Sequence, residues 1–181
     1  MTVTELGLPG VRLVETRVFR DDRGHFLETW NEARYREAGI AGPFVQDNVS
    51  RSHHGVLRGL HLQDPRPQGK LVCVLEGAVW DVAVDVRSGS ATFGQWAAAE
   101  LSAGNARQLW VPPGFAHGFV VTSEHALVLY KCTDVYVPTA EVSLRWDDPD
   151  LAIPWPIAAP VLSDKDAAAL SLRDLAARPG A

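Results

Sequence analysis

Between residues 71 and 133 the chain repeats one pattern, in which a short apolar run is followed by residues that favour turns. The predicted strands of this region cover residues 71–75, 78–86, 92–101, 108–111, 118–121 and 126–133. The turn clusters between them are Glu76-Gly77, Ser88-Gly89-Ser90, Ala103-Gly104-Asn105, Pro112-Pro113-Gly114 and Ser123-Glu124. Short strands at close intervals, with no long helices between them, are typical of an all-β sandwich or barrel.

One of these predicted strands, residues 78–86, alternates strictly between two kinds of side chain. Trp80, Val82 and Val84 alternate with positions that include Asp81 and Asp85. Because successive side chains of a strand point to opposite faces, the pattern predicts one core face and one face that carries the two carboxylates.

The N-terminal part of the chain adds a hairpin and a helix to this plan. Residues 11–19 and 25–30 alternate moderately on either side of a turn at residues 21–24, which predicts a hairpin. Residues 31–38 lack β-branched side chains and end at Gly39, as a short helix would. A further strand is predicted over residues 44–51, where it carries Gln46, Asp47 and Asn48.

The C-terminal part differs in composition, since proline-rich loops replace the strand pattern from residue 138 onward. Residues 163–177 are predicted to form a closing helix, with Ser163 as its N-cap and Arg178-Pro179-Gly180 at its stop. No internal repeat or linker divides the chain, so we expect a single domain over residues 1–181.

Charge and cysteine content exclude several classes of partner. The 181 residues carry a formal net charge of −5 and no run of Lys and Arg longer than two, which argues against a nucleic-acid partner. Cys73 and Cys132 match neither a disulfide framework nor metal-site spacing, so we interpret them as reduced apolar fillers.

The N-terminus shows no signal peptide, and no apolar run approaches the roughly 20 residues of a membrane span. We therefore expect a soluble cytoplasmic protein with no membrane partner.

The stretch from residue 55 to residue 72 concentrates polar side chains on apolar strands. Arg58 and His61 lie on one predicted strand and Lys70 begins the next, and we expect these two strands to pair across a proline-rich connection. His61 stands between two leucines, and burying a titratable group costs free energy unless it has partners. Strict alternation would put Arg58 and His61 on opposite faces, so a shared cavity requires a bulge or twist at Gly59.

The candidate chemistry is general acid–base catalysis. No His-x-His pair is present, which disfavours a metal site, and no Gly-x-Ser-x-Gly motif or phosphate-binding glycine loop occurs. His61 can take a proton, Tyr130 can give one, and Lys70 can stabilise negative charge on an oxygen. This set suits proton abstraction next to a carbonyl. The plainer alternatives are that Tyr130 and Tyr136 are strand aromatics, that His61 is a hydrogen-bonded core imidazole, and that Arg58 and Lys70 are solvated strand-edge charges.

Six motifs in register resemble the dTDP-4-dehydrorhamnose 3,5-epimerase family. They are Arg-Gly-Leu-His-Leu-Gln (58–63), Gln-Gly-Lys-Leu-Val (68–72), Phe-Gly-Gln-Trp (93–96), the segment 107–119, Tyr-Lys-Cys-Thr-Asp-Val-Tyr (130–136) and Ser-Asp-Lys-Asp (163–166). The resemblance implies a cupin-type jelly roll with a short N-terminal helix and a C-terminal helix, and with neither metal nor cofactor. Its core would cover about residues 10–136, with residues 137–181 packed over it. It also implies a homodimer in which exchanged N-terminal strands complete the partner's sheet and site.

The resemblance assigns roles to residues of this chain. His61 would be the base and Asp166 its carboxylate partner, although the sequence after the motif leaves Asp164 open as an alternative. Lys70 would stabilise an enolate, and Tyr130 would reprotonate from the opposite face. The expected contacts with a dTDP-4-keto-6-deoxyhexose substrate are Arg23, Phe26, Glu28, Gln46, Asn48, Arg58, His117, Tyr136, Glu141 and Lys165.

Four readings of the activity remain open at this stage. The first is epimerisation at both C3 and C5, and the second is epimerisation at one of these carbons in the synthesis of a secondary metabolite. Because the candidate acid and base suit both, the sequence does not choose between them. A binding module without catalysis and a metal-dependent cupin enzyme are further alternatives.

Overall fold

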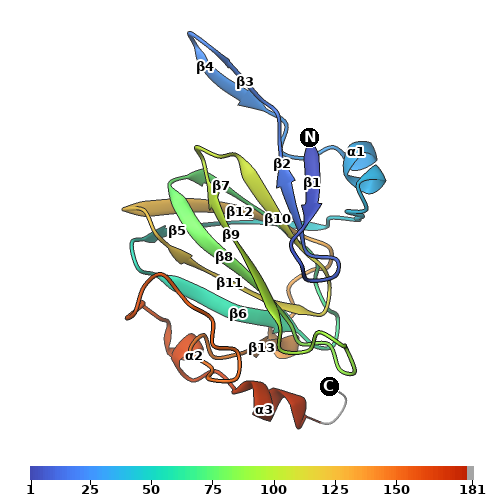
Figure 1. Ribbon diagram of the computed structural model, residues 1–181, viewed down its shortest axis with the longest axis vertical. Helices are drawn as coiled ribbons and strands as arrows, with labels where there is room; N and C mark the ends of the chain where they lie inside the picture. Colours follow the sequence, from blue (N-terminus) through green and yellow to red (C-terminus); the bar gives the residue numbers. More distant parts are fainter. Residues whose placement is uncertain (179–181) are drawn as a thin grey trace.

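The computed structural model describes residues 1–178 and places most strands in two antiparallel sheets (Figure 1). The six-stranded sheet has the order β1 (Thr2–Glu5), β2 (Arg12–Glu15), β10 (Arg107–Val111), β7 (Lys70–Glu76), β12 (His125–Cys132) and β5 (Gln46–His53). The five-stranded sheet has the order β13 (Glu141–Ser143), β6 (Leu57–Gln63), β11 (Phe115–Val121), β8 (Ala78–Asp85) and β9 (Trp96–Ser102). The predicted all-β class is therefore confirmed.

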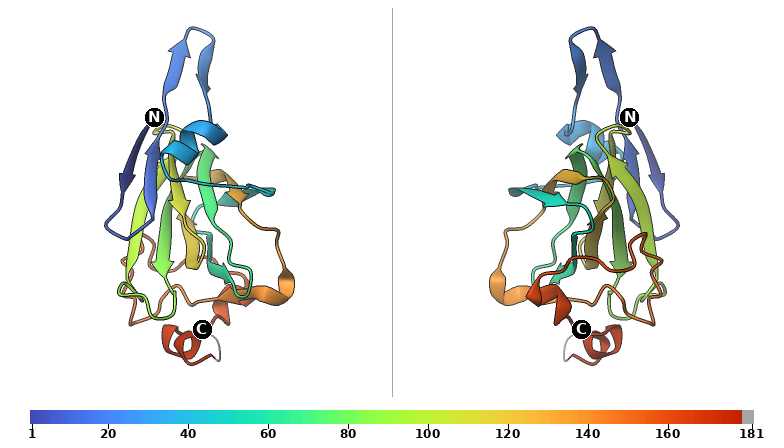
Figure 2. Two further views of the ribbon diagram at one scale, coloured as in Figure 1. Left: turned by 90° about the vertical axis from the view of Figure 1, so that its right-hand side faces the viewer. Right: turned by 90° about the vertical axis from the view of Figure 1, so that its left-hand side faces the viewer.

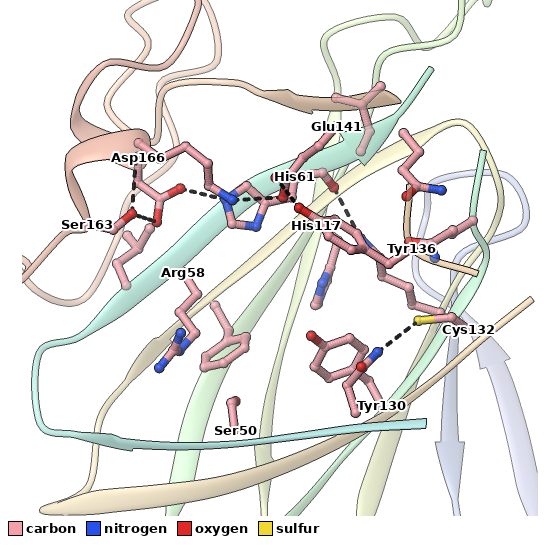
Figure 3. Close-up of a pocket in the computed structure, with 18 of the residues that line it drawn as sticks. Ser50, Arg58, His61, His117, Tyr130, Cys132, Tyr136, Glu141, Ser163 and Asp166 are labelled. Carbon is pink, nitrogen blue, oxygen red and sulfur yellow. Dashed lines mark hydrogen bonds and ion pairs between the residues drawn. The ribbon is translucent and has the colours of Figure 1, made fainter. Parts of the chain in front are cut away.

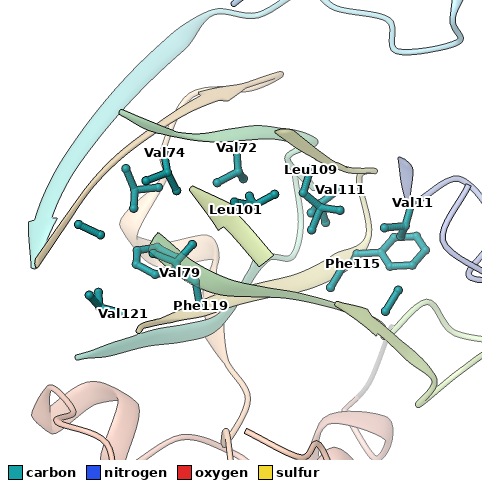
Figure 4. Packing of buried hydrophobic residues seen from close by; sticks show 14 of the residues in the cluster. Val11, Val72, Val74, Val79, Leu101, Leu109, Val111, Phe115, Phe119 and Val121 are labelled. Atoms are coloured by element: carbon teal, nitrogen blue, oxygen red, sulfur yellow. The ribbon is translucent and has the colours of Figure 1, made fainter. Parts of the chain in front are cut away.

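The inner faces of the two sheets enclose the main core (Figure 4). Val72 and Leu109 of the six-stranded sheet pack in one cluster with Leu101 and Phe119 of the five-stranded sheet, and each is at most 3% exposed. Burying aliphatic side chains between sheets stabilises the fold by about 1.5–3 kcal/mol for each fully buried residue. This packing makes a rigid scaffold on which the polar residues of the cavity are held.

The outer face of β8 is also covered, which corrects the prediction of one core face and one carboxylate face. Val82 and Val84 pack against Leu172 and other residues of the C-terminal segment. Asp81 and Asp85 are each 0% exposed and share the inner face of β8 with Val79 and Ala83 of the main core. Asp85 also accepts hydrogen bonds from Arg87, Ser90 and Thr92 of the following loop.

The predicted N-terminal hairpin forms as β3 (Val18–Asp21) and β4 (Gly24–Leu27), which pair only with each other. Figure 2 shows this hairpin projecting beyond the two main sheets. The predicted strand over residues 11–19 is divided, since β2 joins the six-stranded sheet and β3 leaves it. The predicted helix is confirmed as α1 (Glu32–Glu37), with Asn31 as its N-cap.

The two strands of the central stretch do not pair with each other, contrary to the prediction. β6 pairs with β11 and β13, whereas β7 pairs with β10 and β12. The connection at residues 64–69 crosses from one sheet to the other, and each strand takes its hydrogen-bonding partners from distant parts of the chain. β6 and β7 therefore lie on different walls of the sandwich.

The predicted closing helix is two short helices, α2 (Asp164–Ala167) and α3 (Leu172–Ala176). Leu170 forms a bridge with Leu144, which draws the chain out of helical geometry, and Ser171 then caps the second helix. Ser163 caps α2 as predicted. The loop region also contains η1 (Pro138–Ala140) and β13, which the sequence pattern did not indicate.

Smaller differences concern the ends of elements. β9 starts at Trp96 because the residues before it form turns, and β5 extends to His53. The predicted stop at Pro179 and Gly180 lies outside the described residues. No helix within residues 1–178 has the length and apolar character needed to cross a membrane.

Candidate active site

A cavity of about 690 Å³ opens between the sheets and is bordered on one side by the segment that contains α2 (Figure 3). Its walls come from β5, β7 and β12 of the six-stranded sheet and from β6 and β11 of the five-stranded sheet. Every predicted site residue except Arg23, Phe26 and Glu28 lines it. The cavity is large enough for an extended small-molecule ligand.

His61 and Asp166 form a close pair in this cavity. His61 Nε2 lies 2.5 Å from Asp166 Oδ1, and the two side chains are 24% and 5% exposed. Asp164 does not line the cavity, so the carboxylate beside the imidazole is that of Asp166. A carboxylate that accepts one ring N–H fixes the tautomer and leaves the other nitrogen able to take a proton.

The first turn of α2 holds Asp166 in place. Ser163 Oγ accepts a hydrogen bond from the Asp166 backbone N–H and donates one to Asp166 Oδ2 at 2.9 Å. Burial raises the pKa of Asp166, but the hydrogen bonds from His61 and Ser163 and the nearby positive charges lower it by a larger amount. The pKa of Asp166 is therefore below its usual value. Asp166 therefore remains a carboxylate at neutral pH.

The strand β6 carries the predicted irregularity at Gly59. Its register with β11 shifts between the pairs His117–His61 and Phe119–Arg58, and Gly59 has a φ of +121°. This shift brings Arg58 and His61 to the same cavity, as the sequence argument required. Arg58 Nε donates a hydrogen bond to Ser52 Oγ at 3.0 Å, which orients the guanidinium.

Lys70 lies in the cavity wall and is only 8% exposed. Its Nζ donates a hydrogen bond to the backbone carbonyl of His61 at 3.3 Å, and within residues 1–178 it forms no ion pair. Burial lowers the pKa of Lys70, although the negative charges of Glu141 and Asp81 oppose this effect. A buried ammonium without a fixed counter-ion is suited to stabilise an oxyanion.

Tyr130 comes from the wall opposite His61. Tyr130 belongs to β12 in the six-stranded sheet, whereas His61 belongs to β6 in the five-stranded sheet. Burial raises the pKa of Tyr130, so its hydroxyl remains protonated at neutral pH. The cavity thus presents a candidate acid and a candidate base from two different walls.

The comparisons with known proteins agree with this geometry. The model of the dTDP-4-dehydrorhamnose 3,5-epimerase family matches residues 5–174. The chain belongs to this family. It is 56% identical over 168 residues to a dTDP-4-dehydrorhamnose 3,5-epimerase from Pseudomonas aeruginosa, a match that covers 92% of this chain and 93% of that protein.

Solved structures show the same epimerase fold. The epimerase RmlC from Legionella pneumophila, in complex with dTDP-4-keto-L-rhamnose, has a TM-score of 0.93 and 49% identity, with 99% of each chain covered. ChmJ, a 3'-monoepimerase from Streptomyces bikiniensis in complex with dTDP-quinovose, has a TM-score of 0.87 and 36% identity, with 93% of this chain and 86% of that chain covered. The protein is thus an isomerase with a cupin-like β-sandwich.

A second imidazole–carboxylate pair of this epimerase joins His117, which lines the cavity, to Asp81, which is buried behind it. His117 Nε2 lies 2.9 Å and 3.1 Å from the two carboxylate oxygens of Asp81. His117 is also the register neighbour of His61 across β6 and β11. Sequence reasoning proposed His117 as a substrate contact but missed the partner. The signal available was an aspartate between Trp80 and Val82 in a largely apolar strand.

At the cavity rim, a chain of hydrogen bonds joins three of the predicted epimerase contacts. Tyr136 Oη donates to Glu141 Oε2 at 2.9 Å, and Lys165 Nζ donates to Glu141 Oε1 at 2.7 Å. Burial raises the pKa of Glu141, but these two hydrogen bonds and the Lys165 charge lower it overall. Because Lys165 precedes Asp166 in α2, this chain ties that helix to β13.

Cys132 is free and buried, as predicted, but it also lines the cavity, which the sequence analysis did not predict. Its Sγ accepts a hydrogen bond from Asn48 Nδ2 at 3.6 Å. Gln46 Nε2 in turn donates to Asn48 Oδ1 at 3.0 Å. Other lining residues that were not predicted include Ser50, Gln63, Gln68, Phe119 and Ser163.

Three of the residues predicted to contact the substrate lie away from the epimerase cavity. Arg23 and Phe26 belong to the projecting hairpin and Glu28 follows it. The side chain of Arg23 is 90% exposed, and Phe26 is 69% exposed. Within one chain these residues cannot act on a ligand bound beside His61.

Residues 1–178 contain no group of three His, Cys, Asp or Glu side chains that could hold a metal ion.

Proposed function

We propose that this enzyme inverts C3 and C5 of a dTDP-linked 4-keto-6-deoxyhexose. The observation that carries the proposal is the placement of the His61–Asp166 pair and Tyr130 on two walls of one cavity, with Lys70 between the sheets. Inversion at carbon requires a base on one side of the ring and an acid on the other, because a single group would return the proton to the face it left.

The first step is removal of a proton next to the C4 ketone. His61 Nδ1 takes the proton, since Nε2 is engaged by Asp166. The electron pair of the C–H bond forms the enolate double bond, and negative charge gathers on the C4 oxygen. The Lys70 ammonium stabilises that oxygen, and its burial strengthens the interaction because little water screens it.

The second step returns a proton to the same carbon from the opposite face. Tyr130 donates its hydroxyl proton to the enolate carbon, and its raised pKa keeps the proton on the phenol until that moment. The proton held on His61 then exchanges with solvent, and Tyr130 is reprotonated, so the enzyme returns to its starting state. The same pair of groups acts at C3 and at C5 in turn.

The remaining cavity residues are suited to the nucleotide. Tyr136 is 47% exposed at the rim and offers an aromatic face for thymine to stack on. Lys165 supplies positive charge for the diphosphate, while Gln46 and Asn48 offer amide groups to its oxygens. Binding energy from this remote part of the substrate can fix the reacting ring between His61 and Tyr130.

Solvent exchange tests the reaction directly. In deuterated water with dTDP-4-keto-6-deoxyglucose, we expect deuterium at both C3 and C5 of the sugar, as followed by NMR or mass spectrometry. Exchange at C3 alone would assign the chain to the mono-epimerases, of which ChmJ is a structural neighbour. The absence of any exchange, combined with intact dTDP binding, would leave only a binding function.

We further propose that the enzyme acts as a homodimer whose hairpins complete each other's sites. The hairpin β3–β4 leaves Phe19 at 49% and Phe26 at 69% exposure, and such apolar surface favours burial against a partner. Arg23 at the turn would bring positive charge to a neighbouring cavity that already binds a diphosphate. In this arrangement Glu28 would also approach the partner's ligand.

Mixing two inactive variants tests this exchange of hairpins. One variant, His61→Ala, keeps an intact hairpin, and the other, Phe26→Ala with Arg23→Ala, keeps an intact base. If the hairpins act on the partner, the mixed dimer contains one complete site, and the mixture regains activity that neither variant has alone. A mixture that stays inactive although mass spectrometry detects the mixed dimer contradicts the proposal.

A cytoplasmic location is also proposed. Cys73 and Cys132 are both free and buried, which suits a reducing compartment. Fractionation of the producing cells, with a periplasmic marker as control, tests this assignment.

A further inference from the structure

The Ser50 hydroxyl oxygen is the one buried side-chain N or O atom within residues 1–178 that has no hydrogen-bond partner, although Ser50 as a whole is half-buried. It lies on β5 and lines the cavity, and Figure 3 shows it among the side chains that surround the open space. A buried hydroxyl without a partner costs free energy, because it has given up its hydrogen bonds to water. The roles proposed above for the cavity residues do not explain this hydroxyl.

The neighbours of Ser50 on the same strand are all satisfied. Gln46 and Asn48 hydrogen-bond to each other, Asn48 also donates to Cys132, and Ser52 accepts from Arg58. These four residues of β5 alternate along one face of the strand. Ser50 is therefore the single gap in a row of hydrogen-bonded polar groups.

The opposite strand offers Ser50 no polar partner either. The register neighbour of Ser50 on β12 is Val128, a core residue that is 1% exposed. An alanine at position 50 would suit such a neighbour better than an unpartnered hydroxyl. The free protein thus gains no stability from the Ser50 hydroxyl, which points to a ligand atom as its partner.

The position of Ser50 along β5 indicates which part of the substrate it meets. Gln46 Oε1 accepts a hydrogen bond from the Tyr136 backbone N–H, so Gln46 marks the rim where the nucleotide is proposed to bind. Ser50 lies four residues further along the strand, roughly 13 Å away at about 3.3 Å per residue. The register neighbour of Asn48 is Tyr130, so Ser50 lies beyond the proposed acid, at the sugar end.

We infer that the Ser50 hydroxyl donates a hydrogen bond to a secondary hydroxyl oxygen of the hexose ring. This inference rests on the proposed function, since it assumes a dTDP-sugar in the cavity with its nucleotide at Tyr136. Ser50 thereby helps to hold the ring between His61 and Tyr130. Arg58, whose Nε is fixed by Ser52, lines the cavity with Ser50.

The test compares Ser50→Ala with wild-type protein in four measurements, which are the melting temperature, the affinity for dTDP, the affinity for dTDP-glucose and kcat/KM. We expect Ser50→Ala to melt no lower than wild type and to bind dTDP within about twofold of it. Its affinity for dTDP-glucose and its kcat/KM should fall by about tenfold, the size of one hydrogen bond to a neutral group. Ser50→Thr, which keeps a hydroxyl, should recover most of this loss.

A matched serine outside the cavity gives the opposite pattern. Ser102 Oγ accepts a hydrogen bond from the Asn105 backbone N–H at 3.1 Å, and Ser102 does not line the cavity. Ser102→Ala should therefore lower the melting temperature and leave kcat/KM unchanged. This contrast separates a ligand contact from a structural hydrogen bond.

Four outcomes overturn the inference. A lower melting temperature for Ser50→Ala would assign the hydroxyl a structural role, and an equal loss of dTDP affinity would place the contact at the nucleotide. Unchanged affinities and unchanged kcat/KM, in an enzyme that does epimerise, would overturn this inference alone. A wild-type protein that binds neither dTDP nor dTDP-glucose would overturn the proposed function together with it.

Discussion

His61 and Asp166 are separated by 105 positions in the sequence, yet their side chains meet at 2.5 Å between His61 Nε2 and Asp166 Oδ1. The carboxylate is almost fully buried and is held a second time by Ser163. Because both Asp166 oxygens are engaged, the carboxylate cannot rotate freely away from the imidazole. The base of the proposed reaction therefore depends on a helix from the far end of the chain.

Replacing the imidazole tests this base most directly. We expect His61→Ala to lower kcat by roughly 10²- to 10⁴-fold, the range for loss of a general base, and to stop solvent exchange at the sugar carbons. The affinity for dTDP should stay close to that of wild type, because the proposed nucleotide contacts lie at the rim, away from His61. Calorimetric titration with dTDP and NMR-detected exchange are the two measurements, and unchanged exchange would refute the assignment.

The carboxylate predicts a specific dependence of stability on pH. The pKa of Asp166 in the folded state lies below its ordinary value, so the unfolded chain binds this proton more readily. Asp166 therefore adds stability that is fully present above about pH 4 and is lost as pH falls through the folded pKa. Thermal melts between about pH 3 and pH 7 should show a smaller acid-induced loss for Asp166→Asn than for wild type. Parallel curves would show that the pair adds no pH-dependent stability.

Lys70 predicts the alkaline limit of the activity. Burial lowers the pKa of the Lys70 ammonium and raises that of the Tyr130 hydroxyl, so we expect Lys70 to lose its proton first. The rate should then fall with rising pH below the ordinary lysine range, because the neutral amine no longer stabilises the enolate. Lys70→Arg keeps its positive charge at high pH, so the pH at which the rate falls should be higher in this variant, whatever its effect on the maximal rate. If the rate falls at the same pH in both proteins, deprotonation of Tyr130 sets the alkaline limit instead.

Gly59 predicts a cost in stability as well as in geometry. A Cβ at this position would lie 2.5 Å from the Cα of Gly118, and the φ of +121° disfavours every residue other than glycine. We expect Gly59→Ala to lower the free energy of unfolding by roughly 2–4 kcal/mol and to reduce activity by disturbing Arg58 and His61. Gly104→Ala is the control, since the nearest atom to its Cβ is 3.8 Å away. Urea denaturation measures both, and equal effects would contradict the argument.

Much of the fold could be predicted because its signals are local. Turn residues marked the ends of most strands, and Asn31 and Ser163 were identifiable as helix boundaries or caps from their own neighbourhoods. Gly59 was predicted as an irregularity from a conflict between alternation and a shared cavity, and the register shift there confirms it. These features depend on backbone preferences that act within a few residues.

Other features could not be predicted because they depend on contacts between distant residues. The strands on either side of the proline-rich connection were expected to pair, but each found partners in a different sheet. Asp81 was expected on a separate carboxylate face, yet it is buried and paired with His117. Nothing in the few residues around either position encodes which strand will lie beside it.

The sequence by itself determined the all-β class, the short elements and, through several motifs in register, the family and half of the residues that line the cavity. Only the tertiary structure decided that Asp166 rather than Asp164 meets His61, that Asp81 holds His117, and that Ser50 lacks a partner. The physical reason is range: strand and turn preferences are set by neighbouring residues, whereas a hydrogen bond between side chains needs both backbones fixed by the packing of the whole sandwich.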